Sequence, residues 1–395
     1  MLVTCFNEVA GSWTYFKEMA LRIANTGSKI IIISPRAEGN KRKEEVENVT
    51  VYRCSSLVYF PQLPLLLLNP IDFLSTLRKV LQEESSVDLI YDATSGTLPL
   101  SAFAEIFFKL KGIKAPLIIH VLGELKELKS KRLLSLLFES YLHIGARFSY
   151  AIADRILLAG EKIVPRVLSL GARSAKIEIV RVGLRYEGKL QHATNSLSKE
   201  EKERMQISIG LRKEDFVVGY VGRLSPGKGL DILLQSMAMA RNEIPKLKAI
   251  LVGDGGEKAK LNTIASALRV KDITIFLGNR EDVPNLLQLM DVFVNLSESE
   301  AGISAAQLEA MRFALPTVIT PFTEMVKHMK DAIVVPFNDP KAVAEAIILL
   351  HTNDSLRKTI GKNASTRAQE LLRKYTWKGY TDRVLEVFRN VTQSA

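Results

Sequence analysis

Short apolar runs alternate with longer amphipathic stretches along most of this chain. In the second half, runs such as Val292–Asn295 are short and rich in β-branched residues, whereas residues 304–313 carry apolar side chains at helical spacing. Strands that alternate with helices predict a parallel sheet with helices on both faces. Strands are expected at Phe216–Val221, Lys248–Val252, Ile273–Leu277, Val292–Asn295, Thr317–Thr320 and Ile333–Val335. Helices are expected over residues 230–242, 258–269, 283–290, 304–313 and 340–351.

The first half repeats this pattern less regularly. A first strand, MLVTCF, precedes a loop, NEVAGSW, and a helix from about Thr14 to Asn25. Further strands are expected at Lys29–Ser34, Val87–Tyr91, Pro116–Leu122, Ala153–Leu158 and Lys176–Arg181, with helices over 98–110 and 125–148. This α/β order predicts a second domain of the same doubly wound type.

A polar, charged stretch from residue 186 to 214 interrupts the alternation, and within it Ser198 is expected to cap a short helix with Glu201 at its N3 position. We therefore predict a first domain over 1–190, a linker region over 191–214 and a second domain over 215–375. The last segment, 376–395, is expected to be a terminal helix.

Composition narrows the class of protein. The chain has 395 residues, of which 47% are hydrophobic, as in globular domains. The most apolar stretch, 57–74, is interrupted by three prolines, so it does not predict a membrane span. The first residues lack a basic segment of the kind that opens a signal peptide, and the two cysteines show neither a disulfide pattern nor metal-ligand spacing. A cytoplasmic protein is expected.

The net charge of +11 is partly concentrated in one segment. Its cations are Lys109, Lys111, Lys114, Lys126, Lys129, Lys131 and Arg132, against two glutamates, Glu124 and Glu127. Such a cluster suits an anionic membrane surface or a phosphorylated substrate, although it is also compatible with an ordinary solvated surface. No nucleic-acid motif accompanies it, so nucleic acid is not expected as a partner.

The loop GYVGRLSPGKGLD, residues 219–231, follows a strand and leads into a helix. It carries Arg223 and Lys228, two cations suited to a diphosphate whose charge grows as a bond to it breaks. The spacing approaches a Walker A loop, but Gly229 stands where that motif needs Ser or Thr, so an ATPase is not predicted.

The residue pattern from 296 to 320 predicts the end of a strand, then a loop, a helix and a second strand. Gly302 allows close backbone approach, Ser304 is an expected N-cap and Glu309 falls in the second turn of the helix. A loop at the carboxyl end of a strand that feeds a helix N-terminus is a ready anion site.

This segment resembles the Glu-x7-Glu region of retaining glycosyltransferases of the GT-B fold, sequence family 4, whose usual pattern is E-G-F-G-x-x-x-L-E-A-M-A-x-G-x-P-V-V. Six positions match: Gly302, Leu308, Glu309, Ala310, Met311 and Pro316. Ile303 stands for the Phe and Ser304 for the second Gly. The first Glu of the pattern falls on Ala301, with Glu300 one residue out of register.

The resemblance implies two Rossmann-like domains with a cleft between them, and a terminal helix that returns to the first domain. It makes Arg223 and Lys228 the diphosphate-binding pair, Glu309 the ribose ligand and Ala301 the position of a missing contact to the sugar. It places His120 beside the donor sugar. It assigns further donor contacts to Gly11, Ser12, Gly253, Asn279, Arg280, Gly302, Ile303 and Ser304.

The expected activity is a metal-independent hexosyl transfer, with retention, from a nucleotide-diphosphate sugar to a glycan or lipid-linked acceptor. In this family the leaving phosphate is thought to accept the acceptor's proton, and no Asp-x-Asp or paired His motif occurs in this chain. No cofactor beyond the donor is expected. Two alternatives remain open: a donor-binding or regulatory protein with weak turnover, which Ala301 favours, and a nucleotide-sugar 2-epimerase of the same architecture.

Overall fold

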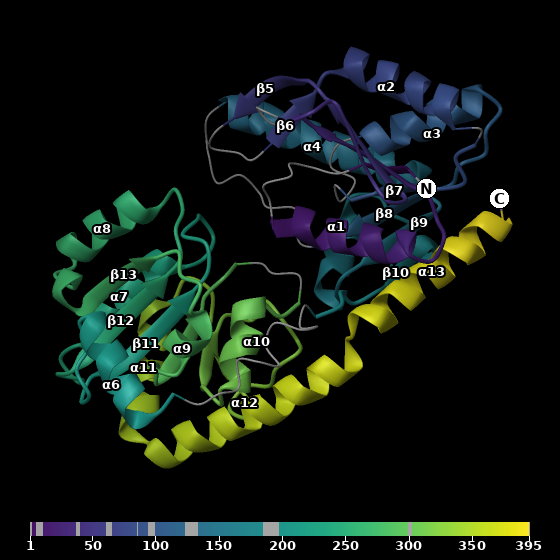
Figure 1. Ribbon diagram of the computed structural model, residues 1–395. Coiled ribbons are helices and arrows are strands. Elements are labelled where there is room, and N and C mark those ends of the chain that lie inside the picture. Colours follow the sequence, from purple (N-terminus) through teal and green to yellow (C-terminus); the bar gives the residue numbers. More distant parts are fainter. Residues whose placement is uncertain are drawn as a thin grey trace. The chain divides into compact units, whose positions relative to one another are not determined.

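A computed structural model describes residues 2–4, 11–36, 40–60, 65–84, 86–93, 99–122, 133–184, 197–298 and 302–394. The chain divides into two compact units. Unit 1 contains Met1–Gly183 together with Trp377–Ala395, and unit 2 contains Leu184–Thr376. Each unit is built on its own sheet (Figure 1).

Unit 2 holds a six-stranded sheet in the order β13-β12-β11-β14-β15-β16, with every neighbouring pair parallel. Its strands are β11 (Phe216–Val221), β12 (Leu247–Val252), β13 (Thr274–Gly278), β14 (Val292–Asn295), β15 (Thr317–Ile319) and β16 (Ile333–Val334). The strands are fully or mostly buried, because helices cover both faces of the sheet.

Two hydrophobic cores form on the two faces of this sheet. Val218 and neighbouring strand residues pack against α7, α8 and α11 on one face, whereas Val217 and Phe293 pack against α9 and α10 on the other. A further cluster joins α10 to α12. The helices are α6 (Lys199–Ser208), α7 (Leu230–Ala240), α8 (Lys258–Ala267), α9 (Val283–Leu287), α10 (Ala305–Arg312), α11 (Pro340–Thr352) and α12 (Asp354–Lys374), with a 3₁₀ turn, η3, at Lys271–Ile273.

Unit 1 holds an eight-stranded sheet in the order β10-β9-β8-β7-β1-β2-β4-β3, in which only β3 is antiparallel to its neighbour. Its strands are β1 (Leu2–Thr4), β2 (Ile30–Pro35), β3 (Lys43–Val46), β4 (Val49–Cys54), β7 (Ile90–Asp92), β8 (Leu117–Val121), β9 (Arg155–Leu158) and β10 (Ile177–Ile179). A separate hairpin pairs β5 (Ser56–Phe60) with β6 (Leu65–Leu68).

The helices of unit 1 are α1 (Gly11–Ala24), α2 (Pro70–Glu83), α3 (Leu100–Leu110), α4 (Leu133–Ile152), α5 (Val164–Ser169) and α13 (Trp377–Ser394), with 3₁₀ turns η1 (Glu161–Ile163) and η2 (Ser174–Lys176). On one face of the sheet, α1 and α13 share a core that includes Met19, Tyr91 and Trp377. The backbone of Trp377 approaches Gly183 so closely that a Cβ there would lie 2.9 Å from the Trp377 Cα atom.

The α/β fold class with two parallel sheets is confirmed, and so is the cap of α6, where Ser198 and Glu201 form a capping box. Several boundaries were wrong. The first helix begins at Gly11 rather than near Thr14, so Gly11 and Ser12 lie in its first turn. The described part of α4 begins at Leu133 and runs four residues beyond the expected end at 148. The short helix predicted after Ser198, within the expected linker region, is confirmed as α6.

Candidate functional site

The strand order of unit 2 reverses between β11 and β14, because β12 and β13 lie on one side of this pair and β15 and β16 on the other. Loops that leave such neighbouring strands at their carboxyl ends turn in opposite directions and leave a crevice where ligands bind in open α/β sheets. The described residues at this position are 222–229, after β11, and 296–298 and 302–304, after β14. They contain the predicted cations and the predicted helix N-terminus.

The loop after β11 is locked to the loop after β12. A Cβ atom on Gly253 would lie 2.0 Å from the Gly222 carbonyl oxygen, so only glycine allows the two backbones to approach this closely. The Leu224 N–H donates to the Asp254 carbonyl at 3.0 Å, and Glu257 N–H donates to the Leu224 carbonyl at 3.0 Å. Leu224 itself is buried in the core of unit 2. The position of Arg223 is therefore fixed on both sides by backbone contacts.

The same loop is also fastened to the end of β14. Gly229 adopts a φ of 65°, and a Cβ there would lie 2.6 Å from Leu296. The Glu298 N–H donates to the Gly227 carbonyl at 2.9 Å. The Lys228 ammonium lies 3.4 Å from the Ser297 hydroxyl. These contacts hold Lys228 at the switch point itself.

A buried polar network underlies this junction. The Asn295 side chain accepts from the Ser297 hydroxyl at 2.8 Å and from the Ser297 N–H at 3.3 Å, and it donates to the Ser304 hydroxyl at 3.1 Å. The Thr320 hydroxyl donates to the Ser297 carbonyl at 2.6 Å. Asn295, Ser297 and Thr320 are all buried. One network thus connects the serine beside Lys228 to the N-cap of α10.

Arg223 projects from this rigid loop into solvent. Its side chain is exposed and makes no hydrogen bond or ion pair with the described residues. Its carbonyl accepts from the Tyr220 hydroxyl at 2.9 Å, which further fixes the backbone. A guanidinium presented in this way can bind a phosphate through two N–H groups without first breaking an ion pair.

The loop after β13 adjoins the loop after β12, since the Gly253 N–H donates to the Gly278 carbonyl at 2.7 Å. Asn279 is exposed, whereas Arg280 forms two bonds of 2.8 Å and 2.7 Å to Asp282. Hydrogen bonding to Asp282 raises the pKa of Arg280, and the same pair lowers the pKa of Asp282. The guanidinium of Arg280 is thus held in place beside Asn279.

Helix α10 begins as the sequence predicts, because the Ser304 hydroxyl accepts the Gln307 N–H at 3.2 Å. Gly302 takes a φ of 86°, which favours glycine. The Ile303 side chain lies in the core beside Met325, which leaves its backbone for any ligand. Glu309 is half-buried in the second turn of the helix. Ala301 lies outside the described residues.

The predicted residues of unit 1 have different surroundings. His120 lies in β8, one residue before its end, and is fully buried in the unit's core. Its Nδ1 atom bonds to the hydroxyls of Tyr91 and of Tyr380, the latter at 3.2 Å. Burial lowers the pKa of His120 to about 3, so the ring is neutral. Gly11 and Ser12 begin α1, the helix that follows β1 at the point where β1 meets β7 and the strand order of this sheet reverses.

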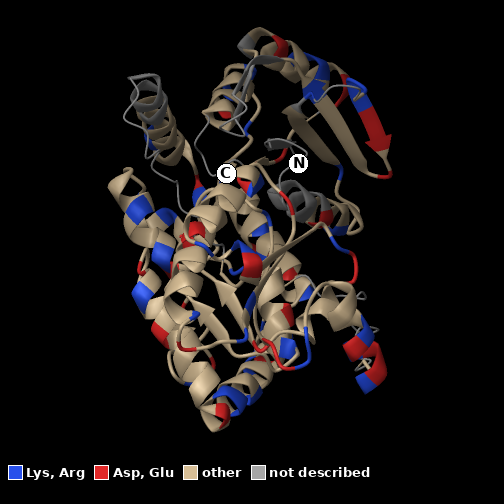
Figure 2. Cartoon of the chain, turned by 90° about the vertical axis from the view of Figure 1, so that its left-hand side faces the viewer, with Lys and Arg blue, Asp and Glu red and all other residues tan. Residues whose placement is uncertain are grey.

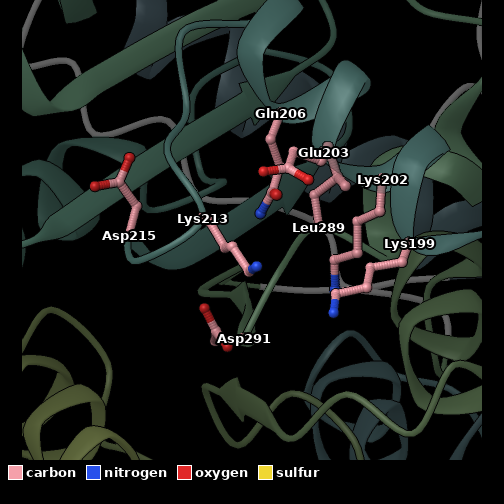
Figure 3. Close-up of a pocket in the computed structure, with 8 residues that line it drawn as sticks. All are labelled: Lys199, Lys202, Glu203, Gln206, Lys213, Asp215, Leu289 and Asp291. Carbon is pink, nitrogen blue, oxygen red and sulfur yellow. The ribbon is translucent and has the colours of Figure 1, made fainter.

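A hollow of about 240 Å³ lies at the opposite edge of the unit 2 sheet, before β11 and β14 (Figure 3). Its walls carry three lysines and three carboxylates, and they comprise Lys199, Lys202, Glu203, Gln206, Lys213, Asp215, Leu289 and Asp291. Asp291 accepts the Val217 N–H at 2.8 Å, and desolvation raises its pKa. Because its charges balance and it faces away from the switch point, this hollow is not the predicted site.

Sequence reasoning missed Asn295, Ser297 and Thr320, which hold the site without being predicted to touch a ligand. The sequence offers only a partial signal, since Asn295 and Ser297 are polar residues at the end of an apolar run. Their burial is visible only in the structure. Within the described residues, His, Cys, Asp and Glu side chains nowhere gather in threes that could hold a metal ion. No helix in the described ranges is both long and apolar enough to cross a membrane.

Profiles of known protein families match both units of the chain. The profile of the family Glycosyl transferases group 1 matches residues 201–367, and that of the Glycosyl transferase 4-like domain matches residues 10–183. A UDP-Gal:α-D-GlcNAc-diphosphoundecaprenol α-1,3-galactosyltransferase of Escherichia coli is 27% identical over 307 residues, 76% of this chain and 75% of that protein. An uncharacterized glycosyltransferase of Methanocaldococcus jannaschii is 28% identical over 200 residues, 49% of this chain and 50% of that protein.

Among solved structures, Anabaena HepE in complex with UDP aligns with a TM-score of 0.72 over 98% of this chain and 99% of that chain, at 19% identity. This likeness concerns the fold. The chain spans about half the length of several curated relatives that it matches. Because the two family profiles together cover both units, and the fold is that of the GT-B glycosyltransferases, this chain belongs to the GT-B glycosyltransferases of sequence family 4.

Proposed function

We propose that this chain is a retaining glycosyltransferase that transfers a sugar from a nucleoside-diphosphate sugar to a glycan or lipid-linked acceptor. The observation that carries the proposal is the switch point of unit 2, where a loop locked by backbone contacts carries Arg223 and Lys228, and a buried network joins the serine beside Lys228 to the N-cap of α10. HepE was solved with UDP, and the E. coli relative acts on a lipid-linked acceptor, which supports this donor and acceptor class.

The chemistry follows from where charge develops. As the glycosidic bond breaks, the leaving diphosphate gains negative charge, and cations held in position before the reaction stabilise that charge without a reorganisation cost. Arg223 would supply a two-point contact and Lys228 a point charge, while the N-terminal end of α10 adds partial positive charge. Glu309 would hold the ribose hydroxyls. With these two cations at the diphosphate, transfer should need no metal.

Removal of either cation tests the assignment. Arg223→Ala or Lys228→Ala should weaken donor binding or transfer by on the order of 2–4 kcal/mol, the scale for truncating one partner of a close charge pair. Lys246→Ala is a matched control, because Lys246 is an exposed cation of the same unit that precedes β12, at the other edge of the sheet. Titration with UDP, ADP and GDP, followed by transfer assays with labelled nucleotide sugars in EDTA, measures both properties.

Two outcomes would contradict the proposal. If both loop variants bind nucleotide and turn over as the unmodified chain does, the loop is not the diphosphate site. If EDTA abolishes transfer and Mg²⁺ or Mn²⁺ restores it, then a metal supplies charge that we assign to Arg223 and Lys228.

Ala301 favours a second candidate, a donor-binding protein with weak turnover, because a family Glu that meets the transferred sugar is replaced here. A misplaced reacting group costs about 100-fold in rate. Ala301→Glu should therefore raise turnover at saturating donor while changing nucleotide affinity little. Equal or lower turnover would show that the sugar is held differently. Hydrolysis assays without acceptor, with analysis of the sugar released, distinguish both candidates from a nucleotide-sugar 2-epimerase.

A further inference from the structure

The hollow at the amino ends of β11 and β14, which we call the basal hollow, has a fixed frame. Its walls come from α6, from the turn that precedes β11 and from the residues that precede β14. The Asp291 carboxylate accepts the Val217 N–H at 2.8 Å, and the Asp215 carboxylate accepts the Arg212 N–H at 2.7 Å. The buried side chain of Leu289 supplies an apolar wall. These contacts make the basal hollow a built cavity of unit 2.

Gln206 is a buried polar side chain that opens into the basal hollow. It is 7% exposed, and its amide makes no hydrogen bond with the described residues. In Figure 3 this side chain runs from α6 toward Lys213. Because a buried amide without a partner costs free energy, nearly all such groups in native proteins are bonded to protein, water or a ligand. The Gln206 amide therefore offers one donor group and one acceptor to an occupant of the hollow.

Three lysines at the basal hollow make no ion pair or hydrogen bond with the described residues: Lys199, Lys202 and Lys213. Elsewhere on the chain, acidic and basic positions are interspersed over the helices, and lysines such as Lys258 and Lys358 pair with an aspartate (Figure 2). Lys199 and Lys202 lie one turn apart on the same face of α6, where like charges repel each other. An anion bound among the three ammonium groups would relieve this repulsion.

The carboxylates of the basal hollow match the number of lysines but do not pair with them. Asp215 and Asp291 each accept a backbone N–H, and the third carboxylate is exposed. In the view of Figure 3, Asp215 lies on the opposite side of the hollow from Lys199 and Lys202. An ionised carboxylate only accepts hydrogen bonds, so it suits the hydroxyl groups of a ligand. The hollow thus offers cations on one side and acceptors on the other.

We propose that the basal hollow binds a small phosphate monoester that carries several hydroxyl groups, the chemistry of a sugar phosphate. A phosphate group with nearly two negative charges suits several ammonium groups, and hydroxyls on the same molecule would meet Asp215, Asp291 and Gln206. The volume of about 240 Å³ lies just below the usual range for drug-sized ligands, about 300–1,000 Å³, so it suits a small molecule. Because the hollow and the predicted diphosphate loop lie at opposite edges of the sheet, this inference does not depend on the proposed function.

Calorimetric titration of the full chain tests the ligand class. The probes are glucose 6-phosphate, inorganic phosphate and glucose, each added with and without saturating UDP. Glucose 6-phosphate should bind at least about tenfold more tightly than inorganic phosphate, because its hydroxyls add hydrogen bonds to charged acceptors. Glucose alone should not bind measurably. UDP should leave these affinities unchanged, and so should Arg223→Ala, which alters the predicted diphosphate loop.

Substitutions in the hollow test the location. Lys199→Gln, Lys202→Gln or Lys213→Gln should each weaken glucose 6-phosphate binding about tenfold, the loss of one hydrogen bond to a charged group, and the triple variant should abolish it. Gln206→Leu should also weaken binding about tenfold without lowering the unfolding midpoint. The matched control replaces three exposed lysines of unit 2 that do not line the hollow by Gln: Lys271, Lys341 and Lys362. UDP affinity should not change in any of these variants.

Three results would overturn the basal hollow as a ligand site. If glucose 6-phosphate binds no more tightly than inorganic phosphate, or does not bind, the hollow holds an adventitious ion only. If the triple lysine variant and Gln206→Leu bind as the control does, the ligand lies elsewhere on the chain. If Arg223→Ala abolishes binding and the hollow variants do not, the probe occupies the predicted diphosphate loop.

Discussion

Asn295 is the residue on which the geometry of the unit 2 switch point depends most directly. Its side chain makes three hydrogen bonds, two from Ser297 and one to Ser304, in a place where Asn295 is 4% exposed and Ser297 is fully buried. Asn295→Ala removes all three bonds and leaves the Ser297 hydroxyl and N–H in a dry environment. At about 1 kcal/mol for each bond, the free energy of unfolding should fall by about 3 kcal/mol.

Calorimetry measures this loss. For a domain of the size of unit 2, about 3 kcal/mol corresponds to a fall of roughly 6–12 °C in the midpoint of its unfolding transition. Nucleotide affinity should fall as well, because the serine beside Lys228 and the cap of α10 lose their common support. Asn363→Ala is the control, since Asn363 makes one exposed hydrogen bond, to the Lys330 carbonyl, and its loss should change stability by less than about 0.5 kcal/mol.

A change of less than about 1 kcal/mol in Asn295→Ala would refute this reasoning, because it would mean that water replaces the lost bonds. A large loss of stability with unchanged nucleotide affinity would separate the two roles. It would leave Asn295 as a structural residue that does not position the loop.

Two further changes test other buried groups. Gln307 is fully buried, and its side-chain amide makes no hydrogen bond with the described residues. Gln307→Leu should therefore raise the free energy of unfolding by about 1–3 kcal/mol. A lower unfolding midpoint in calorimetry would show that the amide is hydrogen-bonded in the folded protein. Burial lowers the pKa of His120 to about 3, against about 6.5 in the unfolded chain, so the stability that it contributes should be complete above pH ~6.5 and fall as the pH drops toward 3. Urea unfolding across this range should show a smaller pH dependence in His120→Gln, and an equal slope in both proteins would contradict the assignment.

The sequence predicted unit 2 well because its strands are buried on both faces. Continuous apolar runs such as Phe216–Val221 mark such strands, and the glycines and serines that follow them mark the turns. The N-cap at Ser304 was also predictable, because serine is a preferred N-cap residue immediately before a helical pattern of apolar residues. Arg223 and Lys228 were singled out from residue type and spacing in their loop, and their role at a diphosphate stays a prediction.

What the sequence did not predict depends on contacts between distant segments. The edge strand β3, KEEV, has no apolar face, and its four residues are all exposed, so no hydrophobic pattern reveals it. Helix α12, Asp354–Lys374, is strongly charged and follows α11 almost without a break, which hid its separate existence. The role of Asn295 was not predicted either, because it depends on Ser304, nine residues away, and on a strand end that comes close only in the folded sheet.

The last helix has a consequence for how the protein is made. Trp377, Tyr380, Val384 and Phe388 of α13 complete a core whose other members include Met19 and Ile30, near the start of the chain. A ribosome adds about 5–20 residues each second, and the amino end of the chain emerges first. Unit 2 is a continuous segment, so all of it has been synthesised before unit 1 receives the helix that closes its core. The domain that is started first is therefore finished last, and premature termination before Trp377 would leave a complete unit 2 attached to a unit 1 with an open hydrophobic face.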